Sequence, residues 1–271
     1  MTPPRIAIQG ERGAYSEEAA VALFGADADI VPCRRLADVF AALDGGAADG
    51  AAVPVENSRA GTVVEAYDLL LARTHAVTGE LRLRVRHCLL GLPGADIGGI
   101  RRARSHPQAL AQCQGFLSGR AITAESAYDT AGSAKELAAA GDASLGAIAS
   151  RRAAAIYGLA VLAEGIEDRP DNVTRFVAVG RAPSRAAGFS KSLLAFSTPN
   201  EPGALVRCLE PFARRGLNLS KIESRPDGET PFAYVFYLDV DHRADQPEMA
   251  AALQDLGRVA RSVRLLGSFG A

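Results

Sequence analysis

The stretch "DNVTRFVAVG", residues 171–180, begins as a polar loop and ends as an apolar strand. Its β-branched and aromatic residues favour a pleated, half-buried position. Two stretches with an α/β pattern precede this strand in the sequence. Because the strand follows the second stretch, its position predicts that the chain returns at this point to the unit formed by the first. Two lobes with a cleft between them result, and small ligands usually bind in such clefts.

The first stretch alternates short apolar runs with Ala-rich helical patterns. Strands are expected at 5–10, 28–33 and 50–57, and helices at 16–25 and 36–46. This alternation is typical of an α/β layer fold with a largely parallel sheet.

The second stretch repeats the same alternation and predicts a second α/β unit. Its elements are expected in apolar segments at 80–92 and 100–117, a helix at 130–141, a strand at 146–150 and a helix through 151–163.

The tail of the chain forms a separate unit. Pro, Gly, Ser and Arg break the pattern around 181–190, which predicts a linker. We expect a first domain at 1–181, a linker at 182–191 and a second domain at 192–271. The second domain is expected to have the ferredoxin-like βαββαβ order, with elements at 192–198, 201–216, 217–226, 232–240, 246–257 and 262–270. In its first helix, Pro202 lies near the start and Gly216 is expected as the C-cap.

The composition is that of a globular protein with roughly two domains. The chain has 271 residues, 48% of them hydrophobic, and a formal net charge of −1. The basic residues are spread along the chain rather than clustered, which indicates no nucleic-acid partner. The start shows no signal-peptide pattern, and no run reaches the roughly 18 apolar residues of a membrane helix, so we expect a cytoplasmic location and no membrane partner.

The four cysteines and four histidines are scattered along the sequence. They form no C-x-x-C pair and no ligand-like spacing, so we expect free thiols and no metal site.

Several stretches together resemble the prephenate dehydratase family. They occur in the family's order as "GERGAYSEEAA" at 10–20, "VPVENSRAGTV" at 53–63, "SHPQALAQC" at 105–113, "YDTAGSAKE" at 128–136 and "NVTRF" at 172–176. The tail resembles an ACT domain with the family's phenylalanine-responsive signatures, "PGAL" at 202–205 and "ESRP" at 223–226. The resemblance implies a periplasmic-binding-protein-like fold for the first domain and no cofactor. It also implies conversion of prephenate to phenylpyruvate, CO2 and water in phenylalanine biosynthesis, with phenylalanine as effector.

The resemblance assigns Thr174 as the catalytic proton donor to the leaving hydroxyl. A fixed donor can stabilise charge that develops on that oxygen. Arg175 is expected to bind a substrate carboxylate bidentately. In a regular strand, however, Thr174 and Arg175 point to opposite faces. The alternative, in which Arg175 forms a salt bridge that supports Thr174, therefore stays open.

Two loops supply further candidates. Glu56, Asn57 and Ser58 follow a strand, where α/β folds collect ligand groups, although Asn and Ser also suit an ordinary turn. Ser105 is expected as an N-cap with Pro107 at N1 and Gln108 completing a capping box, so that the helix N-terminus can hold a carboxylate.

By resemblance, the substrate-binding set comprises residues from all these stretches, with Thr130 as a hydroxyl contact that is equally well explained as part of a helix cap. Gln112 is expected on the same helical face as Gln108. The complete set is Glu56, Asn57, Ser58, Ser105, Gln112, Thr130, Arg175 and Phe176.

A phenylalanine site is expected in the second domain. Gly203 allows close backbone approach, and the following helix offers N–H groups to a carboxylate. The candidate residues are Asn200, Gly203, Ala204, Leu205, Leu219, Glu223 and Ser224. By resemblance the site lies between paired ACT domains. Exposed sheet edges and a helix-free sheet face also predict a homodimer or homotetramer.

Two other functions remain open. Arogenate dehydratase performs the same elimination on the transaminated substrate, and comparing turnover of both substrates distinguishes the two. A non-catalytic small-molecule binding protein is the other, and lack of turnover with prephenate would favour it.

Overall fold

The computed structural model describes residues 2–184, 188–227 and 232–270. The chain divides into two compact units, residues 1–66 with 81–177 and residues 67–80 with 178–271. The strands are β1 (Arg5–Gln9), β2 (Asp29–Cys33), β3 (Gly50–Asn57), β4 (Gly61–Thr62), β5 (Val77–Arg84), β6 (Cys88–Gly91), β7 (Arg102–Ser105), β8 (Thr123–Ser126), β9 (Leu145–Ala149), β10 (Ala160–Glu164), β11 (Val173–Gly180), β12 (Lys191–Ser197), β13 (Leu219–Pro226), β14 (Tyr234–Val240) and β15 (Ser262–Phe269). The helices are α1 (Tyr15–Phe24), α2 (Leu36–Asp44), α3 (Val64–Ala72), η1 (Ile97–Gly99), α4 (Pro107–Gln112), α5 (Gln114–Ser118), α6 (Thr130–Ala140), α7 (Arg151–Tyr157), α8 (Ala204–Ala213) and α9 (Pro247–Val259).

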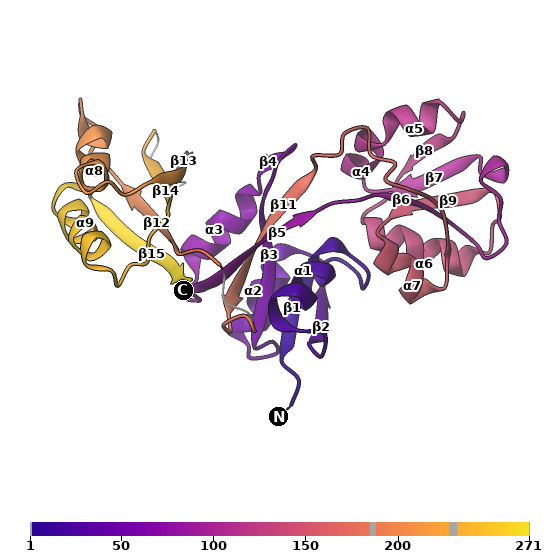
Figure 1. The fold of residues 1–271 in the computed structure, drawn as a ribbon, viewed down its shortest axis with the longest axis horizontal. Helices are drawn as coiled ribbons and strands as arrows, with labels where there is room; N and C mark the ends of the chain where they lie inside the picture. The colour runs from indigo at the N-terminus through magenta and orange to yellow at the C-terminus, as the bar shows by residue number, and fades with distance from the viewer. Residues whose placement is uncertain (1, 185–187, 228–231, 271) are drawn as a thin grey trace. The chain divides into compact units, whose positions relative to one another are not determined.

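The first unit contains two α/β lobes. Lobe 1 is built on strands in the order β11-β3-β1-β2, with β1 parallel to both β2 and β3. Helices α1 and α2 pack on these strands (Figure 1). Phe24 of α1 and Phe40 of α2 are among their buried side chains. The parallel arrangement agrees with the alternating pattern of the sequence.

Lobe 2 has a five-stranded sheet in the order β10-β6-β9-β7-β8, with helices on both faces. In β6, Cys88 and Leu90 face a core cluster with α6 and α7 residues, whereas Leu89 faces a second cluster with α4 and α5 residues. In β9, Ala147 and Ile148 divide between the same two clusters. The strands read as continuous apolar runs because both faces of the sheet are covered.

Two segments, 85–87 and 165–172, join the lobes, and β11 brings the chain back to lobe 1 after lobe 2. The predicted return of the chain at "TRFVAVG" is therefore confirmed. Two α/β lobes with paired crossings are the arrangement of periplasmic-binding-protein-like folds.

One predicted helix is wrong in its second half. The helix expected through 151–163 ends at Tyr157, and 160–164 form β10, which pairs antiparallel with β6. Gly158 lies in the left-handed region at φ 65° and ends the helix. Apolar residues after a left-handed glycine can begin a new element, which periodicity alone does not distinguish from a continuing buried helix.

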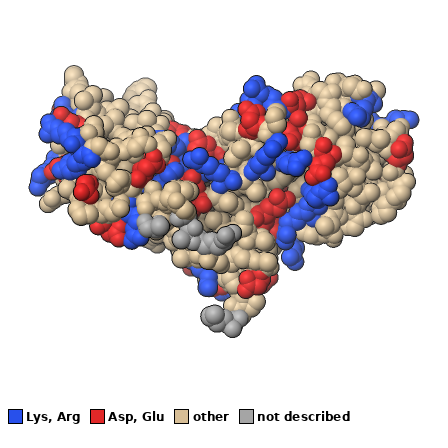
Figure 2. All heavy atoms as spheres, viewed as in Figure 1, with Lys and Arg blue, Asp and Glu red and all other residues tan. Residues whose placement is uncertain are grey.

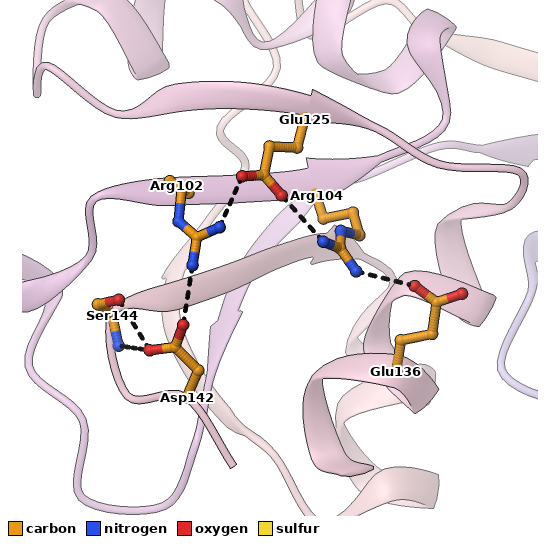
Figure 3. A network of polar contacts seen from close by, with 6 residues as sticks. All are labelled: Arg102, Arg104, Glu125, Glu136, Asp142 and Ser144. Atoms are coloured by element: carbon orange, nitrogen blue, oxygen red, sulfur yellow. Dashed lines mark hydrogen bonds and ion pairs between the residues drawn. The ribbon is translucent and has the colours of Figure 1, made fainter. Parts of the chain in front are cut away.

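An ion-pair network crosses the outer strands of lobe 2 (Figure 3). Glu125 of β8 accepts hydrogen bonds from both Arg102 and Arg104, which lie two residues apart on β7. Arg102 also binds Asp142, and Arg104 binds Glu136 of α6. Residues i and i+2 share one face of a strand, so the network supports the register of the β7–β8 pair.

The second unit contains the predicted βαββαβ domain. Its strands lie in the order β13-β14-β12-β15, and the three pairs are antiparallel. Helices α8 and α9 cover one face, where Leu194, Phe212 and Leu238 belong to one buried cluster. Gly203, at φ 78°, is the N-cap of α8, so Pro202 precedes the helix. The expected C-cap at Gly216 is wrong, because the C-cap is Arg214 and Gly216 lies two residues beyond it.

The other face of this sheet is not free of helix, contrary to the expectation. The ring centroids of Tyr67 in α3 and Tyr237 lie 5.0 Å apart. Asp68 pairs with Arg225 of β13. The Arg264 side chain of β15 donates a hydrogen bond to the Leu71 carbonyl. The expectation was wrong because α3, at Val64–Ala72, was not among the predicted helices.

Residues 185–187 of the predicted linker lie outside the described residues. None of the helices in the described parts of the chain combines the length and hydrophobicity that a membrane crossing requires.

Candidate active site

Both lobes of the first unit line a cavity of about 390 Å³. Asn57 and Thr174 come from lobe 1, and Thr130 and Asp129 from the start of α6 in lobe 2. A smaller adjoining cavity of about 130 Å³ shares Asn57, Thr130 and Thr174 and extends to Gln112. Thr174 therefore lies where the two cavities meet.

Thr174 is the second residue of β11 and is half-buried. Asn57, the last residue of β3, donates a hydrogen bond from Nδ2 to Thr174 Oγ1 at 2.9 Å. This bond occupies a lone pair of the hydroxyl and leaves its proton available. Donation to the oxygen also polarises the O–H bond, so the Thr174 hydroxyl is prepared to donate into the cavity.

The orientation of the Asn57 amide follows from its other partners. Asn57 Oδ1 accepts from the backbone N–H groups of Arg59 and Ala60 at 2.9 and 3.0 Å. Backbone N–H groups can only donate, so the oxygen must face them and Nδ2 must face Thr174. Nδ2 also donates to Asn172 Oδ1 at 2.8 Å.

The same reasoning extends along a chain of side chains. Because Asn172 Oδ1 accepts from Asn57, Asn172 Nδ2 is the donor to Gln112 Oε1, at 2.8 Å. That oxygen is also 2.8 Å from His87 Nε2, which must therefore carry a proton. Burial lowers the pKa of His87, so the neutral Nε2–H tautomer is favoured. Its Nδ1 lies 3.0 Å from the Tyr15 hydroxyl.

Arg175 points away from the cavity. It is 6% exposed, and its Nε lies 3.2 Å from Glu56 Oε2. Neither residue lines the two cavities. The geometry corresponds to the supporting salt bridge, and strand alternation is the reason, because Thr174 takes the opposite face. Phe176 is a core side chain at 2% exposure.

Two other predicted contacts also lie outside the cavity lining. Ser58 Oγ accepts from Val173 N–H and donates to the Asp171 carbonyl, which ties the loop after β3 to the start of β11. Ser105 is buried and donates to the Ile148 carbonyl at 2.7 Å.

The capping box predicted at Ser105 is wrong. The N-cap of α4 is His106, whose Nδ1 accepts from Gln108 N–H at 3.2 Å. Ser105 instead extends β7, where it pairs with Ser126 of β8. Strand pairing holds Ser105 in the sheet, so the cap moves one residue on. Helix α4 has only six residues.

Several cavity residues are not in the predicted set. Tyr15, Arg34 and Tyr128 line the larger cavity, and His87 lines the smaller one. Tyr15 and Tyr128 occur in the motif stretches at 10–20 and 128–136, which were a usable signal. Arg34 had none, because it follows β2 in a segment without a motif.

The cysteines are free, and Cys88 and Cys113 are buried. Burial raises the pKa of the Cys88 thiol to about 11, so it stays protonated at neutral pH and is no nucleophile. Among the residues that the structure describes, no cluster of three His, Cys, Asp or Glu side chains is placed to hold a metal ion.

In the second unit, a cavity of about 210 Å³ is lined by Asn200, Ala204 and Leu205 at the turn before α8. Gly203 lies in that turn.

The remaining phenylalanine-site candidates lie elsewhere in the unit. Leu219 packs against the core cluster, Glu223 pairs with Lys221 at 3.1 Å, and Ser224 is exposed on β13.

Comparison with known proteins identifies the family. The prephenate dehydratase family model matches residues 6–184, and the ACT domain model matches 192–258. Arogenate dehydratase/prephenate dehydratase 2, chloroplastic, from Arabidopsis thaliana is 41% identical over 276 residues, which cover 98% of this chain and 72% of the relative. The chain therefore belongs to the prephenate dehydratase family and carries a C-terminal ACT domain, which confirms the resemblance.

Two solved structures share the fold over nearly the full length. The prephenate dehydratase of Arthrobacter aurescens, solved in complex with L-Phe, is 35% identical with a TM-score of 0.88 and covers 98% of this chain and 90% of its own. A protein described as a novel type of quorum quenching acylase is 34% identical with a TM-score of 0.89 and covers 98% of both chains.

Proposed function

We propose that this protein converts prephenate to phenylpyruvate, CO2 and water in phenylalanine biosynthesis, with Thr174 as the proton donor. The Asn57 Nδ2 bond to Thr174 Oγ1 carries this proposal, because it leaves the hydroxyl proton free for a ligand in the cavity. The electron pair of the C–CO2 bond enters the ring, the ring C–O bond breaks, and the leaving oxygen takes a proton. One prephenate dianion and one proton thus yield one phenylpyruvate anion, CO2 and water.

The direct test is ultraviolet detection of phenylpyruvate from prephenate, with and without phenylalanine. We expect turnover without any added cofactor and inhibition by phenylalanine. A folded protein that gives no phenylpyruvate would contradict the proposal and favour a non-catalytic binding protein.

Substrate contacts are proposed for the candidates that line the cavities, namely Asn57, Gln112 and Thr130. The other candidates do not line either cavity. They are Glu56, Ser58, Ser105, Arg175 and Phe176.

Asn57→Asp is expected to lower kcat by roughly ten- to 100-fold. The carboxylate still accepts from the backbone N–H groups of Arg59 and Ala60, but its second oxygen now faces Thr174 and captures the hydroxyl proton. Steady-state kinetics with prephenate give the result, and circular dichroism confirms folding. Unchanged turnover in the folded variant would show that this hydrogen bond does not orient the donor.

We propose that phenylalanine binds the ACT domain at the turn before α8. The supports are the cavity beside Asn200 and Leu205 and the left-handed Gly203. Inhibition requires that the phenylalanine-bound arrangement be catalytically less competent, so prephenate must in turn weaken phenylalanine binding. Leu219, Glu223 and Ser224 are proposed to contribute from β13 within a homodimer or homotetramer.

Gly203→Val is expected to abolish phenylalanine inhibition while kcat/KM for prephenate stays within about two-fold, because the substituted position lies outside the catalytic cavity. The matched control is Gly216→Val, which places the same side chain at φ 66° with no atom within 4 Å of the added Cβ. Both variants carry similar backbone strain, but only Gly203 adjoins the proposed site. Calorimetric titration with phenylalanine distinguishes them, and equal loss of binding in both would reject the placement.

The domain boundaries 1–181, 182–191 and 192–271 are proposed as well. The family models, which end at 184 and begin at 192, support them, although residues 67–80 group with the second unit by contact. A cytoplasmic location and the absence of a nucleic-acid partner are also proposals. On the face shown in Figure 2, Lys and Arg side chains lie interspersed with Asp and Glu, which gives no basic stripe there.

Arogenate remains a second substrate candidate, since the relative from Arabidopsis thaliana is named for both substrates.

The quorum quenching acylase relative favours a second activity, cleavage of an acyl bond. The cavity supports it less, because no Ser or Thr hydroxyl that lines it is hydrogen-bonded to a histidine in the described part of the chain. Incubation with an N-acyl amide and detection of the released amine tests this alternative.

A further inference from the structure

The larger cavity has two charged side chains, Arg34 and Asp129. Neither lines the smaller cavity, although Thr174 lines both. The two cavities together therefore have one charged end, on the side of Thr174 that belongs to the larger cavity. Toward Gln112 and Asn172, the smaller cavity is lined by amides and histidine. A third cavity shares these two residues and also has Arg59 and Arg169, but both of these side chains pair with Asp171.

Arg34 is available to a ligand. Arg34 lines the larger cavity, and no other Lys or Arg among the described residues lines either of the two cavities. It follows β2, its guanidinium carbon lies 5.0 Å from the centre of the Tyr128 ring, and its carbonyl accepts from the Tyr128 hydroxyl. Its neighbour Arg35, in contrast, is paired with Asp38 at 2.8 Å. Stacking on an aromatic face orients a guanidinium while leaving its N–H donors free.

Asp129 has unused acceptor capacity. It is the N-cap of α6, and its Oδ2 accepts from the backbone N–H groups of Gly132 and Glu11 at 2.9 and 3.2 Å. Both bonds end on the same oxygen, so Oδ1 retains its lone pairs. Arg34 from lobe 1 and Asp129 from lobe 2 thus present opposite charges to one cavity.

The two candidate substrates differ in one group. Both have a ring carboxylate and a side chain that ends in a carboxylate, attached to the ring carbon opposite the leaving hydroxyl. Prephenate carries a keto group on that side chain, and arogenate carries an ammonium. When the leaving hydroxyl lies at Thr174, the ring carbon that carries both carboxylate-bearing groups lies toward one end of the combined cavities. The end that contains Arg34 suits these carboxylates, because a guanidinium binds them well.

We propose that Arg34 and Asp129 form the subsite that discriminates between the keto acid and the amino acid. Arg34 favours the doubly negative prephenate, and Asp129 accepts the ammonium of arogenate. This inference rests on the proposed function and names the residues that set its substrate preference. The two side chains act in opposite directions, which gives the proposal a distinctive signature.

The test measures kcat/KM for prephenate and for arogenate with each variant. Arg34→Gln is expected to lower the prephenate-to-arogenate ratio roughly ten-fold, and Asp129→Asn to raise it roughly ten-fold, the effect of losing one charge-assisted contact. Asn caps a helix as well as Asp does, so Asp129→Asn keeps the start of α6. Arg34→Lys retains the charge and is expected to retain most of the preference.

The matched control is Arg35→Gln, which removes an adjacent positive charge that does not line the cavity and is expected to leave the ratio unchanged. Active variants with unchanged ratios, or with ratios shifted in the same direction, overturn this inference alone. An equal shift in Arg35→Gln also overturns it, since the effect would then be that of net charge. A wild-type protein that converts neither acid overturns the proposed function and the inference with it.

Discussion

Thr174→Val is expected to lower kcat for prephenate by roughly 10²–10⁴-fold, the contribution typical of a positioned general acid. Valine keeps the β-branched shape that suits β11 and removes only the hydroxyl. Asn57 Nδ2 would lose one acceptor but would keep its bond to Asn172, so the cavity wall should persist. The Michaelis constant should change far less than kcat, because the lost contact acts mainly in the transition state.

Two further variants separate chemistry from packing. Thr174→Ser restores a hydroxyl that can still accept from Asn57, and it should recover most of the activity. Thr123→Val places the same substitution on an exposed strand position of lobe 2 and should leave turnover unchanged. Near-normal turnover in folded Thr174→Val, or equal loss in Thr174→Ser, would remove Thr174 from its role as donor.

The sequence predicted the fold well wherever a periodic pattern was bounded by a strong turn residue. The strand at 50–57 and the helix at 130–141 lie close to β3 and α6. The errors arose where tertiary contacts overrode a local signal. Ser105 has the residue type of an N-cap, but pairing with β8 keeps it in the sheet. The apolar run after Gly158 continues a helical pattern, but it forms β10, which pairs with β6.

The site was predictable only in part, for a related reason. Thr174, Asn57 and Thr130 belong to motifs that resemble the family, and all three line the cavity. Arg34 could not be found, because its place opposite lobe 2 depends on folding rather than on its neighbours in sequence. The hydrogen-bond chain from Asn57 to His87 joins residues 115 and 60 positions apart, and no local pattern records it.

The second unit holds a lysine in a nearly fully buried position. The Lys191 side chain at the start of β12 is 3% exposed, and its Nζ lies 3.1 Å from Glu80 of β5 and 3.8 Å from Asp239 of β14. The two carboxylate side chains are 0% and 4% exposed. A buried cation between two acids compensates their desolvation, and removing one partner of such a cluster is far more costly than losing a surface pair.

Lys191→Met is therefore expected to lower the free energy of unfolding by about 3–5 kcal/mol, measured by urea denaturation. Methionine preserves the length and the apolar stem of the side chain, so the loss reports on charge rather than on a cavity. Lys135→Met is the control, because Lys135 pairs with Glu11 at the surface, and its removal should cost less than about 1 kcal/mol. Adding Glu80→Gln and Asp239→Asn to Lys191→Met should recover much of the stability, since the buried negative charges are then removed as well. If Lys191→Met were no more costly than Lys135→Met, the cluster would contribute little to folding, and the buried lysine would need another explanation.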